Sequence, residues 1–135
     1  MSKGGSRLFE YTAGAKAALV SELVASGEKC TPSKIIGITR DPSGKIIWLE
    51  EGNSKSGMKH ISNRHLSEFN KQGVSAKELS TYIMEAITQG NIVGRQGTRS
   101  VYEFKYEGKL HRIAIEIGSN GYVVSANPKS MKGIK

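Results

Sequence analysis

Residues that mark several protein classes are scarce in this sequence. A single cysteine, Cys30, occurs among 135 residues, which excludes an internal disulfide framework and a zinc site built from several cysteines. We expect this one thiol to be buried rather than catalytic. No run of about 18 apolar residues occurs, so no membrane-spanning helix is predicted. The first ten residues lack the apolar segment of a secretory signal, and we expect no signal peptide.

Acidic residues are also few relative to basic ones. Twelve Asp and Glu residues stand against 20 Lys and Arg residues, which gives a net charge of +8. In residues 91–135 alone, eight basic and three acidic residues leave a charge of +5. This balance favours a polyanionic partner such as RNA, DNA, an anionic membrane or an acidic protein. The alternative is a surface that is charged only for solubility.

The length of the chain predicts a single domain over residues 13–135, with residues 1–12 as a linker or a remnant of cloning. Three segments have the apolar spacing of a helix: residues 13–26, 57–70 and 75–90. The third opens with a capping box, in which Ser75 and Glu78 satisfy each other's backbone donors.

The C-terminal third changes to a period of two, which is typical of strands. Three strands are predicted, over residues 102–106, 111–117 and 122–127, with turns at Glu107-Gly108 and Asn120-Gly121. An earlier hairpin is predicted over residues 35–49, around an Asp-Pro-Ser-Gly turn. Residues 91–98 receive no element. The fold class is therefore α+β, with N-terminal helices packed on a C-terminal twisted antiparallel sheet.

The predicted meander has two unlike faces. One is apolar and should pack against the helices: Tyr102, Phe104, Tyr106, Ile113, Ile115 and Ile117. The other is polar: Glu103, Lys105, Arg112, Ser125 and Asn127. An arginine, a hydroxyl and an amide on adjacent strands can bind a phosphate, because arginine presents a rigid fork of donors.

Two of the three histidines lie in the segment GMKHISNRHLSEF, residues 57–69. At 100° per residue, His65 shares a face with the apolar residues of this helix and is predicted to lie against the core. His60 lies on the polar side with Lys59 and Arg64, and is the better candidate for proton transfer. The histidines are five residues and about 140° apart, whereas helical zinc pairs usually sit four residues apart, so no metal is predicted.

Histidine, cations and a hydroxyl on a basic protein suit metal-independent cleavage of RNA. In this reaction the ribose 2′-OH attacks the adjacent phosphate, a general base removes its proton, and a general acid protonates the leaving 5′-oxygen. Cations stabilise the charged phosphorane. The reaction needs no cofactor, and DNA does not react because it lacks the 2′-OH.

A family resemblance is carried by three segments: GMKHISNRH, GVSAKELSTYIMEAITQG and VYEFKYEGKLHRIAIEIGSNGYVVSANP. Together they resemble the Barnase/EndoU/colicin/RelE superfamily of ribonucleases. More narrowly, they are similar to the C-terminal toxin domains of contact-dependent growth inhibition proteins, which cleave transfer RNA in neighbouring bacteria. The resemblance covers about residues 46–128 and rests on the order of elements, a Gly-x-x-His-Ile-x-x-x-His helix and the final Asn-Gly hairpin.

The resemblance implies a helix histidine that faces Arg, Lys, Ser or Thr side chains on the sheet. Carried over to this chain, it gives the catalytic candidates His60, Arg112, Ser125, Lys59 and His65. The RNA-binding candidates are Arg64, Arg95, Thr98, Arg99, Lys105, Asn127 and Lys129. Which of the two helix histidines corresponds to the catalytic one stays open.

The resemblance also implies partners and a location. The substrate would be transfer RNA, with the anticodon loop favoured, and a host translation factor is a further candidate partner. A cognate acidic immunity protein would cover the active site, and a +8 surface suits it through electrostatic steering. The domain would be secreted as the C-terminal part of a large cell-surface protein and act in the cytoplasm of the target cell.

Two other functions fit the sequence. A nucleic-acid-binding module without catalysis is supported by the charge alone, and would bind RNA in a salt-dependent way without cutting it. A metal-dependent nuclease that acts on DNA would nick plasmids in a reaction that EDTA abolishes.

Overall fold

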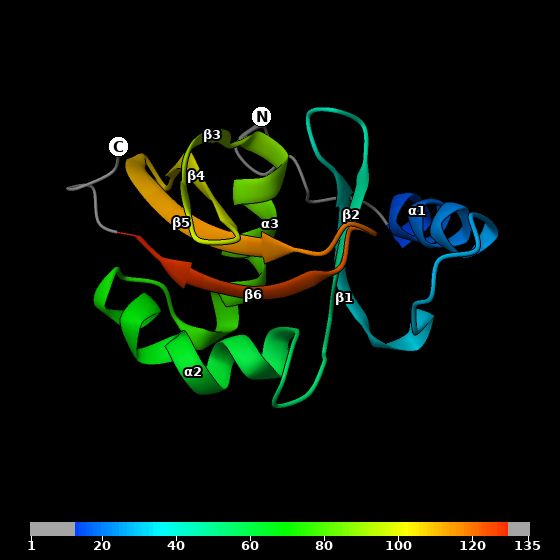
Figure 1. Ribbon diagram of the computed structural model, residues 1–135, viewed down its shortest axis with the longest axis horizontal. Helices are drawn as coiled ribbons and strands as arrows, with labels where there is room; N and C mark the ends of the chain where they lie inside the picture. The colour runs from blue at the N-terminus through cyan, green and yellow to red at the C-terminus, as the bar shows by residue number, and fades with distance from the viewer. Residues whose placement is uncertain (1–12, 130–135) are drawn as a thin grey trace.

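The computed structural model describes residues 13–129 (Figure 1). Along the chain lie α1 (Ala13–Ala25), β1 (Ile35–Arg40), β2 (Ile46–Glu50), α2 (Met58–Lys71), α3 (Leu79–Gln89), β3 (Asn91–Gln96), β4 (Arg99–Tyr106), β5 (Lys109–Ile117) and β6 (Val123–Pro128). Short 3-10 turns precede β1 and α3, at Pro32–Lys34 and Ala76–Glu78. The helices and two antiparallel sheets confirm the α+β class. The linker predicted over residues 1–12 lies outside the described residues.

The larger sheet has four antiparallel strands in the order β3-β4-β5-β6. Strands β4 to β6 are the predicted meander, and both turns lie where the sequence predicts them. The register pairs Tyr102 with Ile113 and Glu103 with Arg112. The apolar and polar side chains therefore separate onto the two faces as expected.

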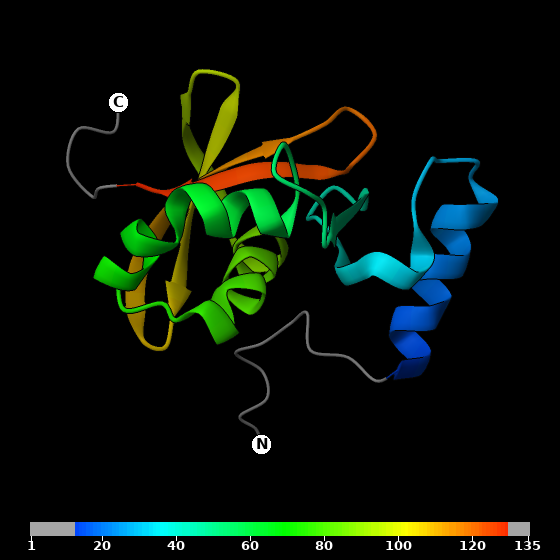
Figure 2. The same ribbon diagram turned by 90° about the horizontal axis from the view of Figure 1, so that it is seen from below.

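Helices α2 and α3 lie on the apolar side of this sheet (Figure 2). The core is built around Tyr82 of α3, whose ring makes edge-on contacts with Phe69 of α2 and with Phe104 and Tyr106 of β4. All four rings are buried, and aromatic pairs in this geometry add to the free energy gained by burial. The packing holds α2 in a fixed position beside β6.

The predicted capping box is present at the start of the α3 segment. The backbone N–H of Ser75 donates to the Glu78 carboxylate at 3.1 Å. The same carboxylate accepts a hydrogen bond from the Tyr106 hydroxyl at 2.6 Å. The cap therefore also ties this helix to β4, which no local sequence pattern indicates.

Strand β3 is missing from the sequence prediction. It is an edge strand of the sheet, and a bulge between Ile92 and Gly94 interrupts its pairing with β4. Its sequence, NIVGRQ, has no alternation of apolar and polar residues, because an edge strand with little buried surface does not need one.

The predicted first hairpin is present as the antiparallel pair β1 and β2. Ile38 and Trp48 face each other across it and form a second buried cluster with Leu23 of α1. The backbone N–H of Trp48 donates to the carbonyl of Gly121 at 3.0 Å, which links this hairpin to the β5–β6 turn. Cys30 is half-buried beside the cluster, so the expectation of a buried thiol is wrong.

Within the described residues, no helix is long and apolar enough to cross a lipid bilayer.

His111, the third histidine, lies on the apolar face of β5. Its Nδ1 atom is 2.8 Å from the hydroxyl oxygen of Tyr82. Burial, and secondarily the charge of Lys109, lowers the pKa of His111, although Glu107 acts in the opposite direction. Burial raises the pKa of Tyr82, so this hydroxyl keeps its proton. The fold therefore favours the neutral form of His111.

We expect this histidine to make the fold less stable in acid. Below a pH of about 6.5, the usual pKa of histidine, the unfolded chain binds a proton that folded His111 does not. As the pH is lowered further, the free energy of unfolding decreases until the pH passes below the pKa of His111 in the folded protein. His111→Gln, which keeps a hydrogen-bonding side chain, should show a smaller difference in unfolding free energy between pH values of about 7.5 and about 5. Urea unfolding of both proteins measures it, and an equal difference would show that His111 does not titrate in this way.

Candidate functional site

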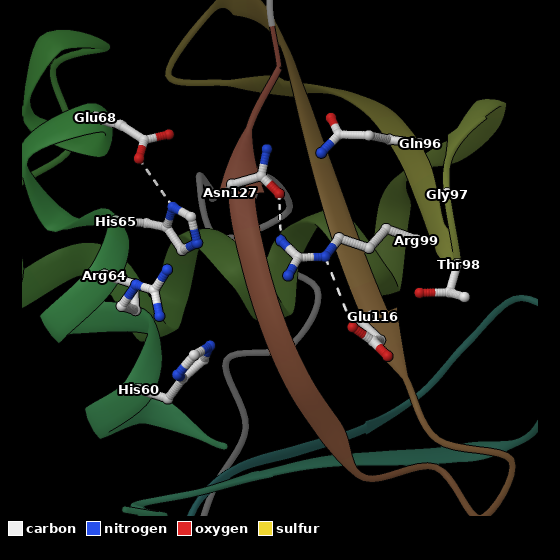
Figure 3. A pocket seen from close by; sticks show the side chains of 10 residues that line it. All are labelled: His60, Arg64, His65, Glu68, Gln96, Gly97, Thr98, Arg99, Glu116 and Asn127. Atoms are coloured by element: carbon white, nitrogen blue, oxygen red, sulfur yellow. Dashed lines mark hydrogen bonds and ion pairs between the residues drawn. The ribbon is translucent and has the colours of Figure 1, made fainter. Parts of the chain in front are cut away.

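A pocket of about 680 Å³ opens between α2, the β3–β4 hairpin and the polar face of the sheet (Figure 3). Helix α2 contributes His60, Arg64, His65 and Glu68. The hairpin and the sheet contribute Gln96, Gly97, Thr98, Arg99, Glu116 and Asn127. Apart from Gly97, every lining residue has a polar or charged side chain, so the pocket suits a polar ligand.

The spacing of residues on α2 explains why they meet in the pocket. His60, Arg64 and Glu68 are four residues apart and therefore follow one stripe along the helix. Ile61 and Phe69 are fully buried and anchor the same helix against the core. The stripe is thus presented from a backbone that the core holds in place.

The loop before α2 fixes where the helix begins. Gly57 caps the helix with φ 84° and ψ −165°, a conformation that is essentially restricted to glycine. Its N–H donates to the carbonyl of Val124 in β6 at 2.9 Å. The N–H of Lys59, one of the donors that a helix cannot satisfy internally, donates to the carbonyl of Glu51 at 2.8 Å. These contacts set the first turn of α2 directly beside β6.

The ring of His65 is held by a carboxylate. Its Nδ1 is 2.9 Å from an oxygen of Glu68, three residues further along the helix. An ionised carboxylate can only accept, so Nδ1 carries the hydrogen of this bond. Nε2 is then the nitrogen that remains for a ligand. With 19% of its side chain exposed, the ring is reachable from the pocket.

The ring of His60 is held by a neutral group instead. Its Nδ1 is 3.0 Å from the backbone carbonyl of Ser54, which also can only accept. Nδ1 therefore carries a hydrogen, and Nε2 of the neutral ring has a lone pair that can take a proton. The carboxylate beside His65 orients that ring, as in catalytic triads. The two histidines thus differ in the charge of their partners.

Arg99 lies opposite these histidines, on the sheet (Figure 3). Its Nη1 donates to the side-chain oxygen of Asn127 in β6, and its Nε is 3.7 Å from a carboxylate oxygen of Glu116 in β5. The strand register explains the contacts, because Ser100 pairs with Ile115 and so places Arg99 beside Glu116. The guanidinium is thereby held by two neighbouring strands.

The tip of the β3–β4 hairpin forms the far wall of the pocket. Gln96 pairs with Arg99, so Gly97 and Thr98 form a two-residue turn, and Gly97 adopts φ 61°, as such turns require. Figure 2 shows that this hairpin stands away from the sheet on the side opposite α2 and α3. It therefore bounds the pocket without covering it.

Six of the predicted site residues meet in this pocket: His60, His65, Arg64, Thr98, Arg99 and Asn127. His65, predicted to lie against the core, is half-buried and also lines the same pocket as His60. The pocket begins at the edge of the buried side of α2, so a residue at the border of the apolar stripe can reach it.

Arg112 does not belong to this pocket. Its Nε and Nη2 atoms lie 2.8 Å from a carboxylate oxygen of Glu103, the residue opposite it on β4. Along β5, Arg112 is four residues from Glu116, which is about 13 Å in a strand. It shares the polar face of the sheet with the pocket residues, but its ion pair joins it to β4 and it does not line the pocket.

Ser125 is also not among the residues that line the pocket. It pairs with Glu116 across the strands, but only 1% of it is exposed, and its Oγ has no hydrogen-bond partner among the described residues. A buried hydroxyl without a partner costs about 1–3 kcal/mol. This position in the sheet floor does not give the hydroxyl access to a substrate.

Ser125→Ala is therefore expected to keep the free energy of unfolding or raise it by up to about 1 kcal/mol, because it removes an unsatisfied hydroxyl. Urea unfolding measures this change. RNA cleavage assayed on the same variant should stay within about threefold of the unaltered protein, and a loss of more than about 100-fold would return Ser125 to the catalytic set.

The other predicted site residues lie outside the pocket lining. Lys59 on α2 and Lys105 on β4 are exposed. Arg95 on β3 is exposed and donates to the Ser100 hydroxyl and the Thr98 carbonyl. Lys129 is half-buried. These cations can contribute to a general attraction for polyanions, but they do not line the pocket.

Four lining residues are missing from the sequence prediction: Glu68, Gln96, Gly97 and Glu116. Glu68 had a detectable signal, because it stands three residues after His65 and four after Arg64 on one helix. No sequence signal indicates the other three. Gln96 and Gly97 belong to the β3–β4 hairpin, and β3 is not predicted. Glu116 lies beside Arg99, which comes from another strand.

Metal ligands do not cluster in residues 13–129. No group of three or more His, Cys, Asp and Glu side chains in this range is arranged to hold a metal ion.

Comparison with known proteins does not place the chain in a family. No protein-family model matches the sequence, and no curated protein matches it. The function has to be inferred from the pocket itself.

Proposed function

We propose that the chain is a metal-independent endoribonuclease whose active site is the pocket between α2 and the sheet. One observation carries the proposal. Two histidines with differently charged hydrogen-bond partners face a held arginine in one polar pocket, on a protein of charge +8. These are the base, the acid and the cation that transesterification of RNA requires.

The roles follow from the partners. Nε2 of His60 takes the proton from the ribose 2′-OH, and the 2′-oxygen attacks the adjacent phosphorus. The bond from phosphorus to the 5′-oxygen breaks, and that oxygen takes a proton from Nε2 of doubly protonated His65, which Glu68 orients. Arg99 and Arg64 stabilise the negative charge of the phosphorane. The products are a 2′,3′-cyclic phosphate and a 5′-hydroxyl, so bonds and protons balance.

We also propose a substrate, a target cell and an inhibitor for this ribonuclease. The sequence resembles toxin domains of the Barnase/EndoU/colicin/RelE superfamily, and we propose that the chain cuts transfer RNA in target bacteria and is neutralised by an acidic immunity protein. The net charge supports both partners, because both are polyanionic. The order of helices and antiparallel strands is compatible with that superfamily.

Sequencing of cleaved ends tests the substrate. Total bacterial RNA is incubated with the protein in EDTA, and ends that carry a 2′,3′-cyclic phosphate are mapped. We expect one dominant cut within transfer RNA. Ends scattered over all RNA classes would contradict the transfer-RNA assignment. Intact RNA that nevertheless binds, with an affinity that falls steeply with salt, would favour a binding module without catalysis.

A further inference from the structure

The amide of Asn127 is turned toward the protein rather than toward a ligand. Its oxygen accepts from Nη1 of Arg99, and its nitrogen donates to the carbonyl of Pro128 at 3.1 Å. A guanidinium can only donate, so the contact with Arg99 requires the amide oxygen on that side. Asn127 is only 8% exposed. These contacts differ from what the sequence suggests, which is direct RNA binding by this amide.

The guanidinium of Arg99 is held on two of its edges. Asn127 binds Nη1, and Glu116 lies 3.7 Å from Nε. Within residues 13–129, no hydrogen bond involves Nη2 of Arg99. The arginine side chain is 22% exposed, and Figure 3 shows its guanidinium directed across β6 toward His65. The Nη2 side of the guanidinium is therefore free to bind a ligand, and the guanidinium is directed toward His65, the proposed general acid.

The other arginines near the pocket are not held in this way. Arg64 on α2 is exposed, and no hydrogen bond or ion pair joins it to another residue in the described part of the chain. Arg95 on β3 is exposed and bonds only to its own hairpin, outside the pocket lining. A long side chain that is free to rotate loses conformational entropy when it binds a ligand. Arg99 has already lost that freedom in the folded protein.

We propose that Arg99 binds the reacting phosphodiester and that Asn127 is a positioning residue, which holds Arg99 in place and does not contact RNA. This inference rests on the proposed function for the identity of the ligand. The anion site itself is independent of cleavage. Groups fixed before the ligand arrives stabilise developing charge without reorganisation. Glu116 helps to orient Arg99 but partly offsets its charge.

Nuclear magnetic resonance tests the anion site without any cleavage. Inorganic phosphate is titrated into ¹⁵N-labelled protein, and the Nε–Hε signals of Arg99 and Arg95 are followed. We expect a sharp Arg99 signal in the free protein and a saturable shift with phosphate, with little shift for Arg95, the matched control. Equal shifts of both arginines would indicate only general attraction and would overturn the proposal.

Variants separate positioning from contact. Asn127→Ala should broaden the Arg99 signal and weaken phosphate binding about tenfold, although Arg99 is unchanged. Asn127→Asp keeps an acceptor, so the signal should stay sharp while the added charge weakens binding. Glu116→Gln should bind phosphate at least as tightly as the unaltered protein. If Asn127→Ala leaves the Arg99 signal and the affinity unaltered, Asn127 does not position Arg99.

A double-mutant cycle in RNA cleavage completes the test. If Asn127 acts through Arg99, Asn127→Ala should lower the cleavage rate in the unaltered protein but have no further effect when Arg99→Ala is already present. Independent losses would show that Asn127 contacts RNA itself and would overturn the proposal. If phosphate binds at Arg99 as described but RNA is never cut, the ribonuclease function fails and the anion site stands.

Discussion

Replacing either pocket histidine is expected to lower the rate of RNA cleavage by about 10²–10⁴-fold, the usual contribution of a general acid or base. His60→Ala removes the group that takes the proton of the 2′-OH, and His65→Ala removes the group that protonates the leaving oxygen. Neither ring is part of the buried core, so both variants should fold. Single-turnover cleavage measures the effect, and circular dichroism checks the fold. Lys59→Ala, next to His60 but outside the pocket lining, is the control and should stay within about threefold.

The two roles can be told apart with a modified substrate. When sulfur replaces the leaving 5′-oxygen, the thiolate departs without a proton, so a general acid is no longer needed. We expect this substrate to restore most of the rate of His65→Ala and none of that of His60→Ala. Rescue of His60→Ala alone would exchange the two assignments. A substrate that rescues neither variant, or full activity of either variant on ordinary RNA, would contradict the acid–base pair.

Gly57→Ala is expected to be the most damaging single change in the frame that holds the site. The φ of 84° and ψ of −165° cost a residue with a Cβ about 1–3 kcal/mol. The added carbon would also lie 2.8 Å from Cα of Gly52 and 3.0 Å from the carbonyl oxygen of Glu50, so the loop must move. Because Gly57 joins α2 to β6, both the free energy of unfolding and the cleavage rate should fall. Urea unfolding and single-turnover cleavage measure the two effects.

Gly73→Ala is the matched control beyond the other end of α2. Gly73 has almost the same φ, 85°, but a Cβ there meets no atom within 4 Å. It should lose only the conformational part of the free energy, about 1 kcal/mol, and keep its cleavage rate. Equal losses of stability in the two variants would show that crowding at Gly57 does not matter. If Gly57→Ala cleaves RNA at the unaltered rate, the way in which Gly57 fixes the start of α2 does not matter for cleavage.

Local patterns were sufficient to predict most elements of the fold. The capping box of Ser75 and Glu78 marks the start of the third helical segment, and the alternation in the C-terminal third predicts β4 to β6 with their two faces. These signals depend on residues close in sequence and on burial with a fixed period. Strand β3 has neither, because it is an edge strand interrupted by a bulge.

The site was predictable only in its residue types. A helical period gives the angle between His60 and His65. It does not show which part of the surface of α2 lines the pocket, and so it does not show that both histidines reach it. The sheet pattern puts Arg112 on the polar face, whereas Arg99 precedes the predicted strands, and the pattern does not give the distance of either arginine from α2. That distance is set by the packing of α2 against β6 and by the contact of Gly57 with Val124, which no local pattern encodes.

Metal-independent transesterification at this pocket is tested most directly with a single RNA substrate in EDTA. A stem-loop that contains the mapped cut is compared with the same stem-loop carrying one 2′-deoxy nucleotide at the cut. We predict a 2′,3′-cyclic phosphate and a 5′-hydroxyl from the ribose substrate, no product from the deoxy substrate, and cleavage of the ribose substrate that is at least about 100-fold slower with His60→Ala. Cleavage at the deoxy position, or cleavage only after Mg²⁺ is added, would contradict it.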